Sequence, residues 1–119
     1  MLADESRVNN GDYFFNVSNG YLTDFGKTLT REQRTSEYVG MARISKEMIG
    51  EFRNHLEEMI GNEQFVVWWE NVLYHYLRTV PVYVKDVSEF FWAEIDYISD
   101  YQRIMRYLET HNLKEKLSD

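Results

Sequence analysis

The sequence predicts an α/β domain in which helices flank a mixed sheet, and three local patterns carry that prediction. An Asn-Gly pair at positions 19–20 separates two aromatic-rich runs. This pair is typical of a β-hairpin, because both residues tolerate positive φ. Apolar side chains recur on one helical face over residues 48–60. An aromatic run at residues 90–95 precedes an amphipathic stretch, as where a strand leads into a helix.

Composition narrows the class of protein further. The 119 residues, 44% of them hydrophobic and 16% aromatic, suffice for one domain with its own core, which we expect to span residues 1–119. The 13 basic and 20 acidic side chains give a net charge of −7, which disfavours nucleic acids and anionic membranes as partners. The chain has no cysteine, no signal peptide and no apolar run of membrane-spanning length. We therefore expect a soluble, cytoplasmic protein without thiol or redox chemistry.

The first third of the chain is predicted to be β structure. Residues 13–17 and 21–25 form the hairpin, and the polar residues 27–36 form an exposed connection. Residues 37–44 resume as a strand, and Gly40 inside it indicates a bulge or a close approach to the backbone.

The rest of the chain alternates helix and strand. Ser45 is the expected N-cap of a helix that ends at Gly61, and residues 63–78 predict a second helix that is apolar on nearly all sides. Residues 80–87 are expected to be extended. A further strand at residues 90–95 then leads into a helix capped by Ser99.

One group of residues with possible chemistry is Glu94-Ile95-Asp96, at the carboxyl end of the last expected strand. Ligands of open α/β sheets bind at that edge, and a carboxylate there can help to hold a magnesium ion with phosphate oxygens and water. The alternative role for Asp96 is to cap the turn into the following helix.

A second group is Trp68-Trp69-Glu70-Asn71. Aromatic rings beside a carboxylate recognise an ammonium group through cation–π attraction and Coulomb pairing. The alternatives are that both tryptophans belong to the core and that Glu70 points into solvent. The three histidines each stand alone and are expected to be structural or solvated, and there is no Gly-rich phosphate loop or nucleophile elbow.

The order of these segments resembles a known enzyme family. A hairpin that ends in Phe25-Gly26-Lys27 is followed by the run from Glu37 to Met41, by Trp68-Trp69-Glu70-Asn71 and by Trp92-Ala93-Glu94-Ile95-Asp96. Over roughly residues 11–109 this order is similar to the carboxyl-terminal half of nucleotidyltransferases of the sugar-phosphate type. Within them it looks most like the phosphocholine and phosphonate cytidylyltransferases.

The resemblance implies a nucleotide-diphospho-sugar transferase-like (GT-A, Rossmann-like) fold. It also implies magnesium-dependent transfer of a nucleotidyl group, usually cytidylyl, from a nucleoside triphosphate to a phosphorylated or phosphonate acceptor such as phosphocholine. By the same resemblance Asp96 is a metal ligand, and the acceptor-side candidates are Glu37, Gly40, Trp69 and Glu70. Tyr38 and Trp68 are expected to be packing residues, and Lys27 matches a lysine that often follows the hairpin.

Some parts of the family pattern are missing. The Gly-rich loop, the lysine that cradles the triphosphate and the first metal-binding aspartate have no counterpart, so no catalytic residue is assigned. We therefore expect a fragment that lacks an N-terminal half, is inactive alone, and can pair with a second copy through its exposed strand edge. Two alternatives stay open: a non-catalytic α+β interaction or dimerisation module, and an unrelated α+β domain with the same segment order by chance.

Overall fold

A computed structural model describes residues 1–9 and 11–111 of the chain. The chain divides into two compact units, Met1–Glu89 and Phe90–Asp119, each of which is described by itself. The described residues form a five-stranded mixed sheet and three α-helices, so the predicted mixed α/β class is confirmed.

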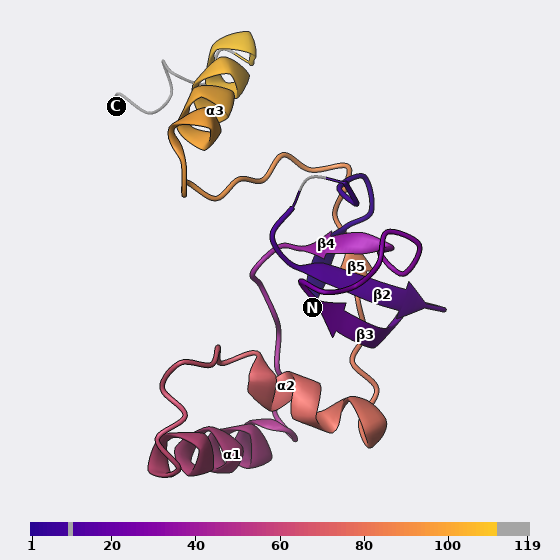
Figure 1. The fold of residues 1–119 in the computed structure, drawn as a ribbon, viewed down its shortest axis with the longest axis vertical. Coiled ribbons are helices and arrows are strands. Elements are labelled where there is room, and N and C mark those ends of the chain that lie inside the picture. The colour runs from indigo at the N-terminus through magenta and orange to yellow at the C-terminus, as the bar shows by residue number, and fades with distance from the viewer. Residues whose placement is uncertain (10, 112–119) are drawn as a thin grey trace. The chain divides into compact units, whose positions relative to one another are not determined.

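The sheet belongs to the first unit (Figure 1). Its strands lie in the order β3-β2-β4-β1-β5. All neighbours pair antiparallel except β1 and β5, which are parallel. The strand bounds are β1 Leu2–Asp4, β2 Phe14–Ser18, β3 Tyr21–Gly26, β4 Ser36–Tyr38 and β5 Lys85–Asp86. Because β4 lies between β2 and β1, both of its edges are paired.

The predicted hairpin is confirmed. Strands β2 and β3 pair from Phe14↔Gly26 to Ser18↔Tyr21, and the turn residues Asn19 and Gly20 have φ of 52° and 80°. These positive values are those required by a tight two-residue turn, which explains the Asn-Gly pair.

The structure differs from the prediction at strands β4 and β1. Strand β4 ends at Tyr38 instead of continuing to residue 44, and Gly40 has a φ of 82° in the left-handed region. The chain therefore turns out of the sheet at the glycine. Strand β1 was not expected. It is held by Ala3↔Tyr38 on one side and by Leu2↔Lys85 on the other, so it depends on partners far away in the sequence.

The helix predicted to end at Gly61 is confirmed as α1, Ile49–Gly61, although Met48 rather than Ser45 is its N-cap. The helix expected over residues 63–78 was wrong in its first half. Only α2, Asn71–His75, and the short 3-10 helix η1, Tyr76–Arg78, are helical. Glu63 has a φ of 57°, a left-handed value that ends the helical path after α1. The β-branched residues Val66 and Val67 have low helix propensity, so they do not favour a new helix before α2.

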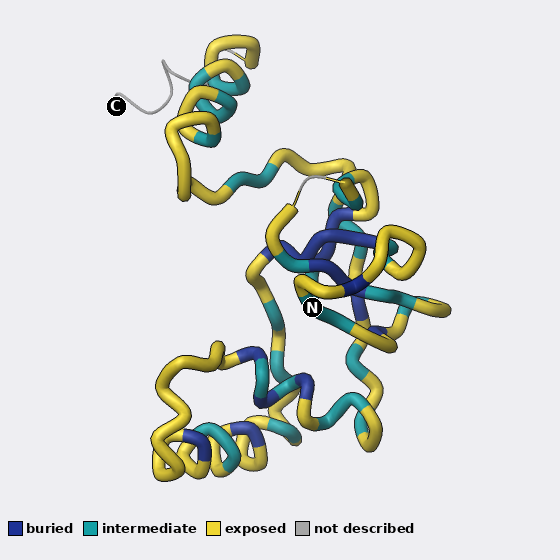
Figure 2. Tube along the Cα trace, in the orientation of Figure 1, coloured by how far each residue is buried: buried dark blue, intermediate teal, exposed yellow. Residues whose placement is uncertain are grey.

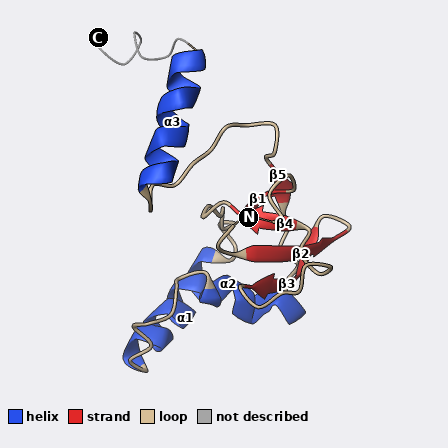
Figure 3. Cartoon of the chain, turned by 45° about the horizontal axis from the view of Figure 1, so that its top comes forward, coloured by secondary structure: helices blue, strands red, loops and turns tan. Residues whose placement is uncertain are grey.

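Two apolar clusters form the core of the first unit (Figure 2). One joins the sheet to α2 through Phe15, Tyr38 and Tyr74, and the other joins α1 to α2 through Phe52, Met59 and Val72. Phe15 and Val72 are fully buried. Helix α2 contributes to both clusters, which fixes it beside the β2–β3 hairpin (Figure 3).

The second unit contains α3, Ile98–Thr110, and the segment before it. The strand expected at residues 90–95 was wrong, because this segment is irregular and pairs with no described strand. It packs instead on α3, where the rings of Phe91 and Tyr107 stack at 3.6 Å between centroids. The expected cap was also wrong: Tyr97 is the N-cap, and its N–H donates to the Asp100 carboxylate at 3.0 Å. Among the described residues, no helix has the length and apolar character needed to cross a membrane.

Candidate functional site

The most distinctive polar group in the first unit is the Glu70 carboxylate, which is buried among aromatic rings. Glu70 immediately precedes α2 and is only 7% exposed. Rings from the residue before β2, from β3, β4 and α2, and from the loop before α2 gather near it. We call this group the Glu70 cluster; its members are Glu70, Tyr13, Phe25, Tyr38, Trp68 and Tyr74.

One hydrogen bond fixes the carboxylate. The Tyr38 hydroxyl donates to Glu70 Oε1 at 3.2 Å, and both residues are buried. A hydrogen bond to an ionised acceptor is about twice as strong as a neutral one. The bond therefore offsets part of the cost of removing the carboxylate from water.

The rings of the cluster pack on one another. Tyr74 lies on Phe25 at 3.7 Å between centroids with the planes 11° apart. Tyr13 is stacked on Tyr74 at 6.0 Å and lies 5.1 Å from Trp68. The cluster is therefore built across the hairpin, α2 and the preceding loop.

Two tyrosine hydroxyls of the cluster have perturbed acidity. Burial, together with nearby Tyr13, Tyr38 and Glu70, raises the pKa of Tyr74 far above its ordinary value. Burial also raises the pKa of Tyr13 against the lowering effect of the Tyr74 hydroxyl, and the Glu70 charge adds to the rise. The Tyr74 hydroxyl is buried and faces the Tyr13 hydroxyl, although the two do not meet the distance and angle of a full hydrogen bond.

The cluster reaches the surface at Trp68, which is 48% exposed. The Lys27 ammonium lies over its ring, 5.3 Å from the centroid. An alkylammonium group of the protein itself thus already occupies the face of this ring. The cluster thus combines an exposed ring face at Trp68 with a buried carboxylate at Glu70. This is the arrangement that attracts an organic cation.

The two neighbouring tryptophans have different ring neighbours in the structure. Trp69, the predicted acceptor residue, lies 6.2 Å from the Phe52 ring of α1, whereas Trp68, the predicted packing residue, lies in the Glu70 cluster. The expectation that Tyr38 only packs was incomplete, since its hydroxyl holds Glu70. Gly40 lies in the turn after β4 and is exposed.

Glu37 lies on the other face of the sheet from Tyr38, because successive residues of a strand point to opposite faces. Its carboxylate lies 3.5 Å from Arg7, and it accepts a hydrogen bond from the Asp12 N–H at 3.3 Å. Arg7 also lies 3.7 Å from the buried Asp4. Burial raises the pKa of Glu37 despite the opposing effect of Arg7. Glu37 therefore belongs to a separate ionic cluster.

Asp96 is exposed in the turn before α3. Its N–H donates to the Asp100 carboxylate at 3.3 Å, so its backbone takes part in the start of the helix. Within the described ranges, no three His, Asp or Glu side chains are placed to hold a metal ion. The metal role of Asp96 therefore stays a prediction.

Sequence reasoning missed Tyr13 and Tyr74 as members of the site. Both occur in apolar segments, where an aromatic residue is indistinguishable from core. It also treated the histidines as isolated, whereas the His55 and His75 rings stack at 4.2 Å between α1 and α2. A signal for Glu70 was present, because a carboxylate in an apolar segment is costly to bury without a partner.

Comparison with family models, with curated proteins and with solved structures finds no match to this chain.

Proposed function

We propose that this chain binds a small organic cation at the Glu70 cluster, and that it does so as the acceptor-binding part of a nucleotidyltransferase. The acceptor would be a phosphorylated or phosphonate molecule with an ammonium group, such as phosphocholine. The observation that carries the proposal is the buried Glu70 carboxylate, which is held by Tyr38 in the same cluster as the packed rings of Tyr13, Tyr74 and Trp68.

The chemistry of the cluster favours a cation over a neutral ligand. A quaternary ammonium has no N–H to donate, so it is recognised by ring faces and by an opposite charge rather than by directed hydrogen bonds. Each ring contact contributes about 0.5–2 kcal/mol to such binding. The approach of Lys27 to the Trp68 ring supports the idea that this ring face accepts an alkylammonium group.

The nucleotidyl-transfer part of the proposal rests on the order of sequence segments. Such a reaction needs the two substrates aligned for attack on the α-phosphorus and needs charge stabilisation around the phosphates. Neither the Gly-rich phosphate loop nor a complete metal site is present among the described residues. The chain would therefore supply acceptor binding, and other protein elements would complete a GT-A-like nucleotide site with Asp96 as one magnesium ligand.

The test is calorimetric titration of the chain with choline and phosphocholine, with 3,3-dimethylbutanol as the uncharged analogue of choline. We expect choline to bind at least tenfold more tightly than the alcohol. Glu70→Gln keeps the shape and the hydrogen-bond acceptor but removes the charge, so it should abolish that preference. Glu63→Gln removes a charge from the exposed start of the same loop and should leave it unchanged.

Equal binding of choline and the neutral alcohol would overturn the cation-binding proposal. So would unchanged choline affinity in Glu70→Gln. Nucleotidyl transfer is tested separately, by pyrophosphate release from the chain combined with the nucleotide-binding part that the resemblance implies. If the chain binds choline but the combined protein releases no pyrophosphate, the cation-binding proposal stands and the nucleotidyltransferase proposal is wrong.

A second candidate role is an interaction module, and one observation favours it. The segment between α1 and α2 exposes three apolar side chains in succession, with Phe65 70% and Val66 95% exposed and Val67 41% exposed. Exposed apolar residues in a run mark an interface. A second copy of the chain would cover them. Sedimentation of the wild type against Phe65→Ser tests this: a dimer that dissociates in the variant supports self-association, and a monomeric wild type rejects it.

A further inference from the structure

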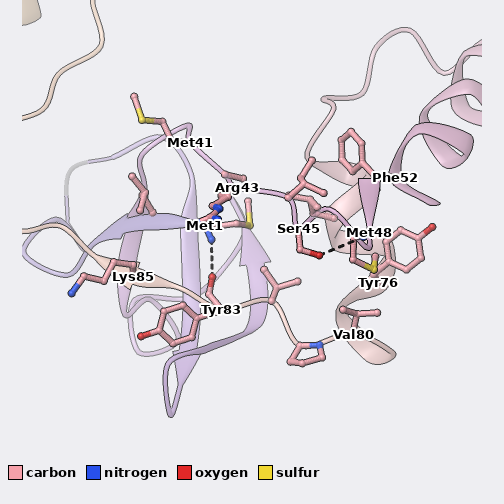
Figure 4. A pocket seen from close by; sticks show the side chains of 16 residues that line it. Met1, Met41, Arg43, Ser45, Met48, Phe52, Tyr76, Val80, Tyr83 and Lys85 are labelled. Carbon is pink, nitrogen blue, oxygen red and sulfur yellow. Dashed lines mark hydrogen bonds between the residues drawn. The ribbon is translucent and has the colours of Figure 1, made fainter. Parts of the chain in front are cut away.

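A groove distinct from the Glu70 cluster lies between the sheet and the helices of the first unit (Figure 4). Its volume is about 690 Å³, which is within the usual range of small-molecule sites of about 300–1,000 Å³. The lining comes from the start of β1, the segment after β4, the helices α1, α2 and η1, and the chain from Val80 to Lys85 in β5.

Most of the lining is apolar and adaptable. Three methionines, Met1, Met41 and Met48, contribute to the wall, and Phe52 and Leu73 close it on the helix side. Methionine is flexible and polarisable, so it adjusts to chains of varied shape. The groove therefore suits a flexible aliphatic ligand better than a rigid polar one.

The charged side chains of the lining are all of one sign. Arg43 and Lys85 line the groove, and its lining contains no Asp or Glu, although the chain as a whole carries 20 acidic and 13 basic side chains. Neither cation forms a side-chain hydrogen bond or ion pair with any residue of the ranges 1–9 and 11–111. The groove thus offers unpaired positive charge within a strongly acidic protein.

Both cations lie at one end of the groove, together with Met1, Met41 and Tyr83, and the lining of the other end carries no charge. Arg43 and Lys85 lie on the sheet side, and Phe52, Met48 and Tyr76 lie on the helix side (Figure 4). We infer that the groove binds a single amphiphile with an anionic head group, such as a long-chain fatty acid. Its carboxylate would lie beside Arg43 and Lys85, and its aliphatic chain would run toward α1 and η1.

The experiment is a calorimetric titration of the chain with dodecanoate below its micelle-forming concentration. Dodecanol and dodecylammonium, which have the same chain length, serve as the neutral and the cationic comparison. We expect dodecanoate to bind at least tenfold more tightly than either probe. The double variant Arg43→Gln with Lys85→Gln should remove that preference. Lys46→Gln, which removes an exposed cation outside the lining, should change the dodecanoate affinity by less than twofold.

A charge-swap variant gives an independent readout. Met41 lines the groove but is 61% exposed, so Met41→Glu adds a negative charge without disturbing the core. This variant should lose affinity for dodecanoate and gain affinity for dodecylammonium, while Met41→Gln should do neither. Equal affinity for dodecanoate and dodecanol would overturn the inference. Binding to phosphatidylglycerol vesicles without binding to monomeric dodecanoate would also overturn it, in favour of a membrane surface.

Discussion

The hydrogen bond from Tyr38 to Glu70 makes the most direct quantitative test of the candidate site. Tyr38→Phe removes the hydroxyl and keeps the ring, which stacks on Phe15 at 4.9 Å. The donor–acceptor distance is 3.2 Å and both residues are less than 9% exposed, so water does not readily replace the lost donor. A hydrogen bond to a charged group contributes about 1.5–3 kcal/mol. We expect this loss in the free energy of unfolding.

A double-mutant cycle separates the charge from the hydroxyl. In a Glu70→Gln background the acceptor is neutral, so Tyr38→Phe should cost only about 0.5–1.5 kcal/mol. The difference, about 1 kcal/mol, is the coupling that depends on the carboxylate charge. Urea unfolding followed by tryptophan fluorescence measures all four corners of the cycle.

The control is Tyr83→Phe, which removes a hydroxyl from a residue that is 59% exposed and should change stability by less than about 0.5 kcal/mol. A cost for Tyr38→Phe as small as that of the control would show that the phenol does not hold the carboxylate. Equal costs in the wild-type and Glu70→Gln backgrounds would show that the carboxylate is not charged in the folded protein.

Three further predictions concern the core and the buried titratable groups. Phe15→Ala should destabilise the first unit by about 3–5 kcal/mol, because the side chain is fully buried in the sheet core; denaturant unfolding measures this. The raised pKa of Tyr74 means that its phenol stays protonated until the protein unfolds in alkali, so stability should fall above about pH 10. Absorbance at about 295 nm should then show one fewer late-ionising tyrosine in Tyr74→Phe. Burial raises the pKa of Glu37 above its ordinary 4.5, so the folded state holds this proton more tightly than the unfolded state. The contribution of Glu37 to the free energy of unfolding should therefore fall as the pH rises from 4 through the pKa of the folded state. Unfolding free energies measured at about pH 4 and pH 7 should show this decrease in the wild type and not in Glu37→Gln.

The parts of the fold that the sequence predicts well are those that local chemistry decides. The Asn19-Gly20 turn fixes the hairpin because few other residues adopt two consecutive positive φ values. Helix α1 was predicted because its apolar face is regular over three turns. Strand β1 could not be predicted in this way. Its three residues have little pattern of their own and are held by partners more than 30 positions away.

The same distinction holds for the Glu70 cluster. The sequence identified Glu70 through its cost of burial, but the residue that compensates for that cost, Tyr38, lies on a strand 32 positions earlier. The choice between Trp68 and Trp69 depended on the start of α2. The predicted helix over residues 63–78 would have placed both rings on its surface, whereas the irregular path before Asn71 turns them toward different neighbours.

Successive side chains of β4 point to opposite faces of the sheet, and this limits which of the predicted acceptor residues can contact the same ligand. Glu37 and Tyr38 point to opposite faces of a strand whose two edges are both paired, so a small ligand at Glu70 cannot reach around the strand to the Glu37 carboxylate. If choline binds at the Glu70 cluster, Glu37→Gln should leave its affinity within about twofold, while Glu70→Gln should weaken it at least tenfold. Calorimetry on the two isosteric variants decides the point, with the melting temperature of each as the check on folding. Equal losses in both variants would mean that the acceptor contacts both faces, which this sheet topology does not allow, and the assignment of the binding site would have to be abandoned.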